Sequence, residues 1–271
     1  MRPALSTTSL RSFTVRASIE AAHRLGYAGI EIWAEHLWSG GESPAALARL
    51  AAAHGLVVTV HGPSRDLNVT SSNPGIRSES RRQYRQALED AARLGARIAT
   101  FHPGARSSSR DSPDDYWVPM VDFFGGLGAA GARLGVLVAV ENMEERPAEL
   151  ITDPRAVARL VDAVGDGRLG LTLDVAHLLF NRKPIDLVGL EAYVRHVHLS
   201  GSTETLVHVP LAEGVYPLGP ALARLGRFYT GIVAFEGYAP GREMETVEAN
   251  RRAYDRLLAD VMSSRGVPTD G

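Results

Sequence analysis

The sequence predicts an α/β protein built as a single (β/α)8 TIM barrel, and three observations lead to this prediction. Its 271 residues are close to the roughly 250 that are typical of one such barrel. Short apolar runs alternate eight times with longer amphipathic segments, which indicates parallel strands joined by helical crossovers. A doubly wound open sheet is the main alternative, but no glycine-rich phosphate loop follows the first expected strand.

The expected strands are rich in Val, Ile, Leu and Ala and lack strict polar alternation. This pattern is typical of parallel strands that are buried on both faces. A weaker first strand is expected near residues 3–8. The seven clearer strands are 28–33, 56–61, 97–102, 136–141, 169–174, 194–199 and 231–236.

The expected helices carry start and stop signals. The helix at 44–54 begins at Pro44 and stops before Gly55, the usual asymmetry of proline at the start and glycine at the end. The other helices are 14–25, 77–94, 113–134, 154–164, 185–193, 218–228 and 243–262. One domain is expected over residues 1–271, with a polar tail from about 263.

Composition excludes several classes of protein. The chain has no cysteine, so disulfides, thiolate metal sites and a cysteine nucleophile are ruled out. A formal net charge of -2 offers no general attraction to DNA. No apolar run approaches the roughly 20 residues that span a bilayer, and the first residues lack a signal-peptide pattern. A cytoplasmic protein without membrane partners is expected.

Nearly every expected strand ends in a side chain that can bind a metal or move a proton. Because the C-terminal ends of barrel strands converge on one mouth, these side chains should lie close together. Seven of them in register are hard to explain by packing, since buried carboxylates are costly unless paired or metal-bound. They are Glu31, His61, His102, Glu141, Asp174, His198 and Glu236.

Each of these residues also has a simpler structural explanation. A lone histidine such as His61 or His102 is more often a hydrogen-bonded core residue, and a strand-end acid can form a buried ion pair with arginine. Three converging carboxylates, however, would raise one another's pKa unless a cation neutralised them. The sequence therefore predicts a divalent metal. A mixture with neutral imidazole favours Mn, Zn, Co or Fe over calcium, and Mg stays among the candidates.

Residues beside the strand ends supply further candidates. His177 follows Asp174 closely enough for both to point into the mouth, and His208 lies in a long loop that could cover a substrate. Trp33 is expected to wall the pocket, although an aromatic residue there is more often simply packing. His196 shares a strand face with His198 and should lie one layer deeper, in a structural role.

Short motifs lie at the ends of the expected strands and in the segments that follow them. They are His61-Gly62-Pro63 with Asp66-Leu67-Asn68, His102-Pro103-Gly104, Glu141-Asn142-Met143, Asp174 through His177, His198-Leu199 and Phe235-Glu236. In order and spacing they resemble the xylose-isomerase-like TIM-barrel superfamily, over nearly the whole chain. That superfamily includes sugar-phosphate isomerases and epimerases, and also the endonuclease IV branch of abasic-site (AP) nucleases.

The resemblance implies a set of ligands. In the isomerase and epimerase branches the metal ligands would be Glu141, Asp174, His198 and Glu236. In the nuclease branch the positions of His61 and His102 hold a second ion with Glu141, and those of His177 and His208 help hold a third. The sequence departs from the nuclease pattern at Leu206, where an acidic ligand is expected, and at Ser64 and Arg65, where an apolar DNA wedge is expected. It departs from the sugar epimerases at Glu204, where a substrate-contacting arginine is expected.

Two enzymatic functions are therefore weighed. The favoured one is a metal-dependent isomerase or epimerase of a sugar or sugar phosphate, in which Glu141 and Glu236 transfer a proton through an enediolate. Substrate contacts are expected from His177, His208, Glu31 and Trp33. The alternative is a phosphodiesterase that cleaves DNA at abasic sites, and a third reading is a barrel that only binds a sugar. A small sugar-like molecule is thus favoured over DNA as the partner, and a homo-oligomer stays open.

Overall fold

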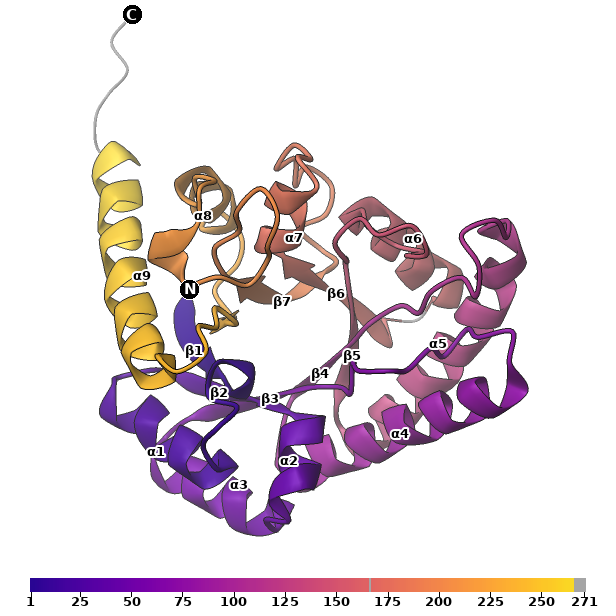
Figure 1. The fold of residues 1–271 in the computed structure, drawn as a ribbon, viewed down its shortest axis with the longest axis horizontal. Coiled ribbons are helices and arrows are strands. Elements are labelled where there is room, and N and C mark those ends of the chain that lie inside the picture. Colours follow the sequence, from indigo (N-terminus) through magenta and orange to yellow (C-terminus); the bar gives the residue numbers. More distant parts are fainter. Residues whose placement is uncertain (166, 266–271) are drawn as a thin grey trace, which may run out of the picture.

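The computed structural model, which describes residues 1–165 and 167–265, contains a closed barrel of eight parallel strands in chain order (Figure 1). The ring is closed by β1 (Arg2–Ser6), which pairs with both β2 (Gly29–Trp33) and β8 (Ile232–Phe235). Between them lie β3 (Val57–His61), β4 (Ile98–Phe101), β5 (Leu137–Glu141), β6 (Leu169–Asp174) and β7 (Val194–Leu199). The structure confirms the single (β/α)8 barrel predicted from the sequence.

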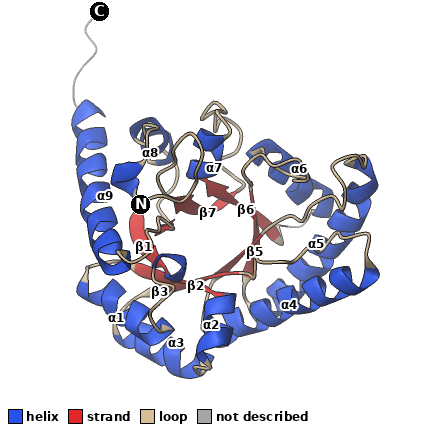
Figure 2. Cartoon of the chain, in the orientation of Figure 1, coloured by secondary structure: helices blue, strands red, loops and turns tan. Residues whose placement is uncertain are grey.

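Helices surround the strands on the outside (Figure 2). They are α1 (Val15–Arg24), α2 (Ala34–Gly40), α3 (Pro44–Ala53), α4 (Pro74–Arg93), α5 (Asp114–Leu134), α6 (Pro154–Val164), α7 (Val175–Phe180), α8 (Gly219–Leu225) and α9 (Glu243–Arg265). Thr14, Asn73 and Asp153 cap α1, α4 and α6 by accepting hydrogen bonds from backbone N–H groups of the first turn. Within the described part of the chain, no helix is both long and apolar enough to cross a bilayer.

Two expectations about helices need correction. The helix predicted at 185–193 was wrong, because that segment is loop and turn, and α7 instead starts directly after β6. The Asp174 side chain accepts a hydrogen bond from the His177 backbone N–H and so begins α7 early. The short helix α2 was missed, since Trp33 at its start makes no side-chain cap bond. The polar tail expected from about 263 begins inside α9, and residues 266–271 lie outside the described residues.

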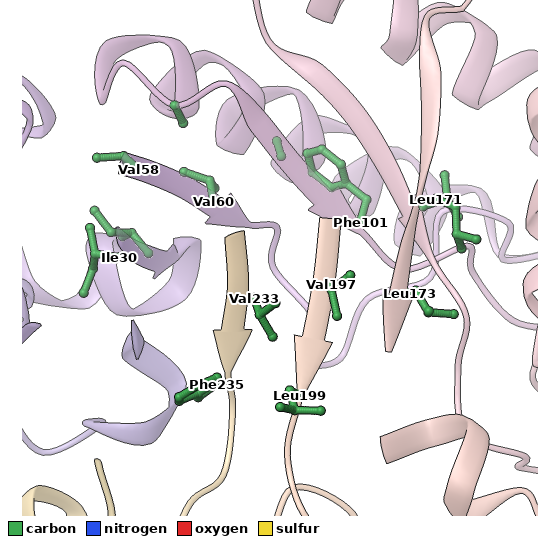
Figure 3. Close-up of a cluster of buried hydrophobic side chains, with 14 of the residues drawn as sticks. Ile30, Val58, Val60, Phe101, Leu171, Leu173, Val197, Leu199, Val233 and Phe235 are labelled. Atoms are coloured by element: carbon green, nitrogen blue, oxygen red, sulfur yellow. The ribbon is translucent and has the colours of Figure 1, made fainter. Parts of the chain in front are cut away.

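The main apolar core lies between the strands and the helices. Figure 3 shows part of it, including Val197 and Leu199 of β7 and Val233 and Phe235 of β8, all buried in one cluster. Successive side chains of a strand point to opposite faces. Residues that alternate with this outward-facing set therefore point toward the barrel axis, where the chemistry predicted from the sequence must lie.

The barrel interior changes from apolar to polar along the strands. Near the N-terminal ends, Ala4, Ile232 and Ala234 form a small apolar cluster against Val57. One layer further, the Oγ1 atoms of Thr100 and Thr172 are hydrogen-bonded at 2.8 Å across the interior. The C-terminal ends carry the acids and histidines, so the polar groups gather at one end of the barrel.

Candidate active site

A cavity of about 330 Å³ opens at the C-terminal ends of the strands. This volume is in the range of small-molecule sites. Seven of the residues predicted from strand ends and their loops line the cavity: Trp33, His61, His102, Glu141, His177, His208 and Glu236. The structure thus brings together side chains that are up to 203 positions apart in the sequence, the separation of Trp33 and Glu236.

The four residues expected to bind a metal lie around a common point. Each offers a ligand atom within 4.8 Å of the others, and all four are buried. Nδ1 of His198 is 2.8 Å from Oε1 of Glu141, 3.4 Å from Oε2 of Glu236 and 4.0 Å from Oδ2 of Asp174. Glu141, Asp174 and His198 come from β5, β6 and β7, and Glu236 follows β8 by one residue.

The charges of the buried acids in this group are only partly compensated. Oε2 of Glu141 and Oδ2 of Asp174 are buried without a hydrogen-bond partner. Burial, together with the charge of Glu141, raises the pKa of Asp174 to about 6 and that of Glu236 to about 7. Burial would also raise the Glu141 pKa, but His198, His102 and His61 hold it well below its usual range. Three carboxylates and one imidazole fit a divalent cation, which would supply the missing positive charge.

His61 and His102 form a second group with Glu141. Their Nε2 atoms each lie 3.4 Å from Oε2 of Glu141, and the three ligand atoms are within 4.8 Å of one another. Burial would lower the pKa of His61, but the hydrogen bond to Glu141 and its charge raise it to about 9. The two histidines that the sequence alone could have explained as core residues therefore lie against Glu141, a carboxylate of the candidate metal centre.

His177 and His208 lie side by side on the cavity wall. Their Nε2 atoms are 3.1 Å apart, and with Asp174 they form a third group of closely placed ligand atoms. Leu206, which stands where the nuclease pattern has an acid, is 61% exposed. Glu144 was missed by sequence reasoning, although its carboxylate Oε2 lies 3.3 Å from Nε2 of His177 and it lines the cavity. The sequence feature that could have indicated Glu144 as a cavity residue is its position three residues after Glu141.

Glu31, which was expected to contact substrate, lies below the cavity and does not line it. It is fully buried, whereas Trp33, two residues later on β2, lines the cavity. Because the end of β2 is Trp33, the Glu31 side chain sits one layer deeper. There Glu31 accepts a hydrogen bond from Thr59 at 2.9 Å and lies 2.6 Å from Nε2 of His196 and 3.1 Å from Nε2 of His198.

This arrangement makes Glu31 a partner of His198. With Nε2 facing Glu31, His198 turns Nδ1 toward Glu141, Asp174 and Glu236. A carboxylate on the far nitrogen commonly fixes the orientation and tautomer of a metal-binding histidine. We expect Glu31→Gln to weaken divalent-metal affinity by about 10- to 100-fold. Competition with a chelating dye would measure it, with the exposed Glu89→Gln as control. Unchanged affinity in a folded Glu31→Gln protein would contradict this role.

The fold and the cluster define the class: a (β/α)8 barrel with a buried carboxylate–histidine centre at the C-terminal ends of its strands. The family model described as a xylose isomerase-like TIM barrel matches residues 19–257. The chain belongs to this family.

Curated relatives and solved structures extend the comparison. The chain is 26% identical over 180 residues to an uncharacterized protein of Methanocaldococcus jannaschii, covering 66% of each chain. It is 23% identical over 167 residues to D-psicose 3-epimerase of Agrobacterium fabrum (59% of this chain and 57% of that one). It is 29% identical over 124 residues to probable endonuclease 4 of Mycobacterium leprae (45% and 46%). The matches thus span no more than 66% of these relatives' length.

Among solved structures, an L-ribulose 3-epimerase superposes with a TM-score of 0.86 at 14% identity, covering 100% of this chain and 99% of that one. A D-tagatose 3-epimerase-like protein gives 0.84 at 20% identity, covering 98% and 100%. At these identities the superpositions establish a shared fold.

Proposed function

We propose that this protein is a divalent-metal-dependent isomerase or epimerase that moves a proton next to the carbonyl of a small sugar or sugar phosphate, through an enediolate. The observation that carries the proposal is the pairing of Glu141 and Glu236 in one cavity. Both carboxylates contact Nδ1 of His198, yet the pKa of Glu236 is raised to about 7 and that of Glu141 is lowered. Two acids whose pKa values are pushed apart suit the two halves of an acid–base reaction.

Each residue of the cavity has a part in this chemistry. A cation held by Glu141, Asp174, His198 and Glu236 would supply Lewis acidity that stabilises negative charge on adjacent substrate oxygens. Glu236 lines the cavity next to Nδ1 of His198 and would take and return the proton. Glu141 would act from β5, and His177 and His208 would hold substrate hydroxyl groups. Trp33 would wall the cavity against water.

The comparisons support the same reaction class. The Agrobacterium fabrum relative is a D-psicose 3-epimerase. The two superposed structures are an L-ribulose 3-epimerase and a D-tagatose 3-epimerase-like protein. A cavity of about 330 Å³ also suits a monosaccharide-sized substrate.

Abasic-site cleavage is the second candidate, because two further ligand groups adjoin the four-residue centre. The His61–His102 group shares Glu141 with it, and the His177–His208 group shares Asp174. The Mycobacterium leprae relative, a probable endonuclease 4, points in the same direction. Against it stand the exposed Leu206 and a net charge of -2, which gives no general attraction to a polyanion. We favour the isomerase or epimerase.

Metal content per chain after purification separates the two candidates. One equivalent is expected for the isomerase or epimerase and three for the nuclease. Two equivalents would fit either function, because the His61–His102–Glu141 group could hold the second ion. In that case, incubation with an abasic-site oligonucleotide distinguishes the two functions. Cleavage of that oligonucleotide, without deuterium exchange into any ketose in deuterated water, would overturn the proposal.

A further inference from the structure

Two arginines stand beside Trp33 on the rim of the cavity. Arg65, in the loop after β3, places its guanidinium carbon 4.6 Å from the centroid of the Trp33 ring. Arg11, in the loop after β1, lies 5.8 Å from the same ring and 4.3 Å from that of Tyr238. Cations over aromatic faces are attracted by the ring quadrupole. The rings therefore hold two like charges near each other at the cavity entrance.

These guanidinium groups lack carboxylate partners among the described residues. Arg11 donates from Nε to the backbone oxygen of Thr8 at 2.8 Å, and Arg65 has no side-chain hydrogen bond or ion pair there. The nearby acid Glu35 instead accepts the backbone N–H groups of Ser64 and Arg65, at 3.4 and 3.1 Å. Burial and the charge of Arg65 lower the pKa of Arg11, although the charges of Glu236 and Glu243 oppose this shift.

Trp33 adds an unused donor at the same place. It is 6% exposed and its indole Nε1 has no hydrogen-bond partner among the described residues. A buried donor without an acceptor is costly, so this indole is incompletely satisfied within the described residues. A second cavity of about 350 Å³ shares Arg11, Trp33 and Arg65 with the first, and Glu35, whose carboxylate accepts backbone N–H groups, lines it as well. There is thus room for a group beside all three residues.

The opposite wall of the main cavity has the contrary charge. Glu144 and Glu149 line it, and Arg146 there is already ion-paired with Glu144. Burial and the charge of Glu144 raise the pKa of Glu149 to about 7. An anionic group would be repelled from this wall and attracted to the arginines, so the cavity is electrically asymmetric.

We infer that Arg11 and Arg65, held beside the Trp33 ring, form a subsite for a terminal anionic group, phosphate or carboxylate, on the substrate. This inference rests on the proposed function for treating the cavity as the substrate site. Planar guanidinium groups bind both anions through paired N–H donors. The reactive end of the substrate then lies toward Glu141 and Glu236 and the charged end toward the rim.

The test compares three ketoses that differ at one end: neutral D-fructose, D-fructose 6-phosphate and D-fructuronate. Their dissociation constants are measured by calorimetry on the metal-loaded protein at fixed ionic strength. At least one anionic ketose is expected to bind about tenfold or more tightly than D-fructose, and its identity separates phosphate from carboxylate. Arg65→Gln and Arg11→Gln should each raise that constant about tenfold or more and leave D-fructose unchanged.

Arg110→Gln is the matched control, because Arg110 is exposed in the loop after β4 but does not line either cavity. Equal affinity for the three ketoses, no binding of any of them, or an equal loss in the control would overturn the subsite. Deuterium exchange on the same samples keeps the two claims apart. Exchange with charge-independent binding would overturn the subsite alone. Arginine-dependent binding without exchange would support the subsite and count against the proposed reaction.

Discussion

Glu236→Gln should lower turnover by about a thousandfold or more while the barrel stays folded. General acid–base groups contribute about 10²- to 10⁴-fold, and this substitution also removes one carboxylate from the four-residue centre. Glutamine keeps the shape of the side chain at the end of β8 but can neither take nor return a proton. Turnover, metal content and the circular dichroism spectrum would be measured on the same preparation.

Proton exchange gives the sharper readout for Glu236. Substrate incubated in deuterated water with Glu236→Gln should show no incorporation by NMR, whereas the wild-type protein should label the carbon next to the carbonyl. Glu213→Gln is a suitable control, because Glu213 lies in the loop after β7 and pairs with Arg242 outside the cavity. Retained exchange in metal-loaded Glu236→Gln would remove Glu236 from the acid–base role.

Asp174→Asn should lower metal affinity by at least about a hundredfold. This exceeds the loss that is typical when a residue behind a metal ligand is replaced. The substitution is chosen because Asp174 also caps α7 through the His177 N–H. Asparagine caps helices about as well as aspartate, so the start of α7 is preserved while a ligand charge is lost. Turnover should fall with metal occupancy, and excess metal should restore part of it.

The same substitution should have the opposite effect on the metal-free protein. The folded-state pKa of Asp174, about 6, lies above its ordinary value, so its contribution to stability is lost as pH rises between about 4 and 6. At pH 8, chelated Asp174→Asn should be more stable than chelated wild type by on the order of 1–3 kcal/mol. Below about pH 4 the difference should vanish. Denaturant unfolding with chelator at both pH values measures it. A less stable variant at pH 8 would show that the Asp174 charge is compensated without metal.

Much of the fold follows from local patterns, because buried parallel strands and capped helices leave strong signals. All eight strands lie at or within the predicted ranges to within one or two residues. The errors have local causes. Residues 185–193 have helical spacing, yet the chain leaves α7 at Arg182 in a left-handed conformation (φ 53°), and Gly189 also has a positive φ of 78°. For α2, nothing in the sequence announces a helix directly after a strand.

The positions of site residues could be predicted where they depend only on a strand ending at the barrel mouth. They could not be predicted where they depend on how deep in the barrel a side chain lies. Glu141, Asp174, His198 and Glu236 converge because barrel strands finish at one mouth. Whether Glu31 touches the cavity depends on where β2 ends relative to its neighbours, and no local signal sets that stagger. No sequence motif marks Arg11, because its placement depends on the rings of Trp33, at the end of β2, and Tyr238, after β8.

The pairing of β1 with β8 has a consequence during synthesis. A chain still growing on the ribosome cannot complete the ring until β8 has emerged, because the edge of β1 that faces away from β2 pairs only with Ile232 to Phe235. Until then two strand edges stay open to association with other chains. Glu236, the last residue of the four-residue centre along the chain, emerges together with β8. Catalytic competence should therefore appear abruptly with the final strand, and truncated products should need chaperones rather than show partial activity.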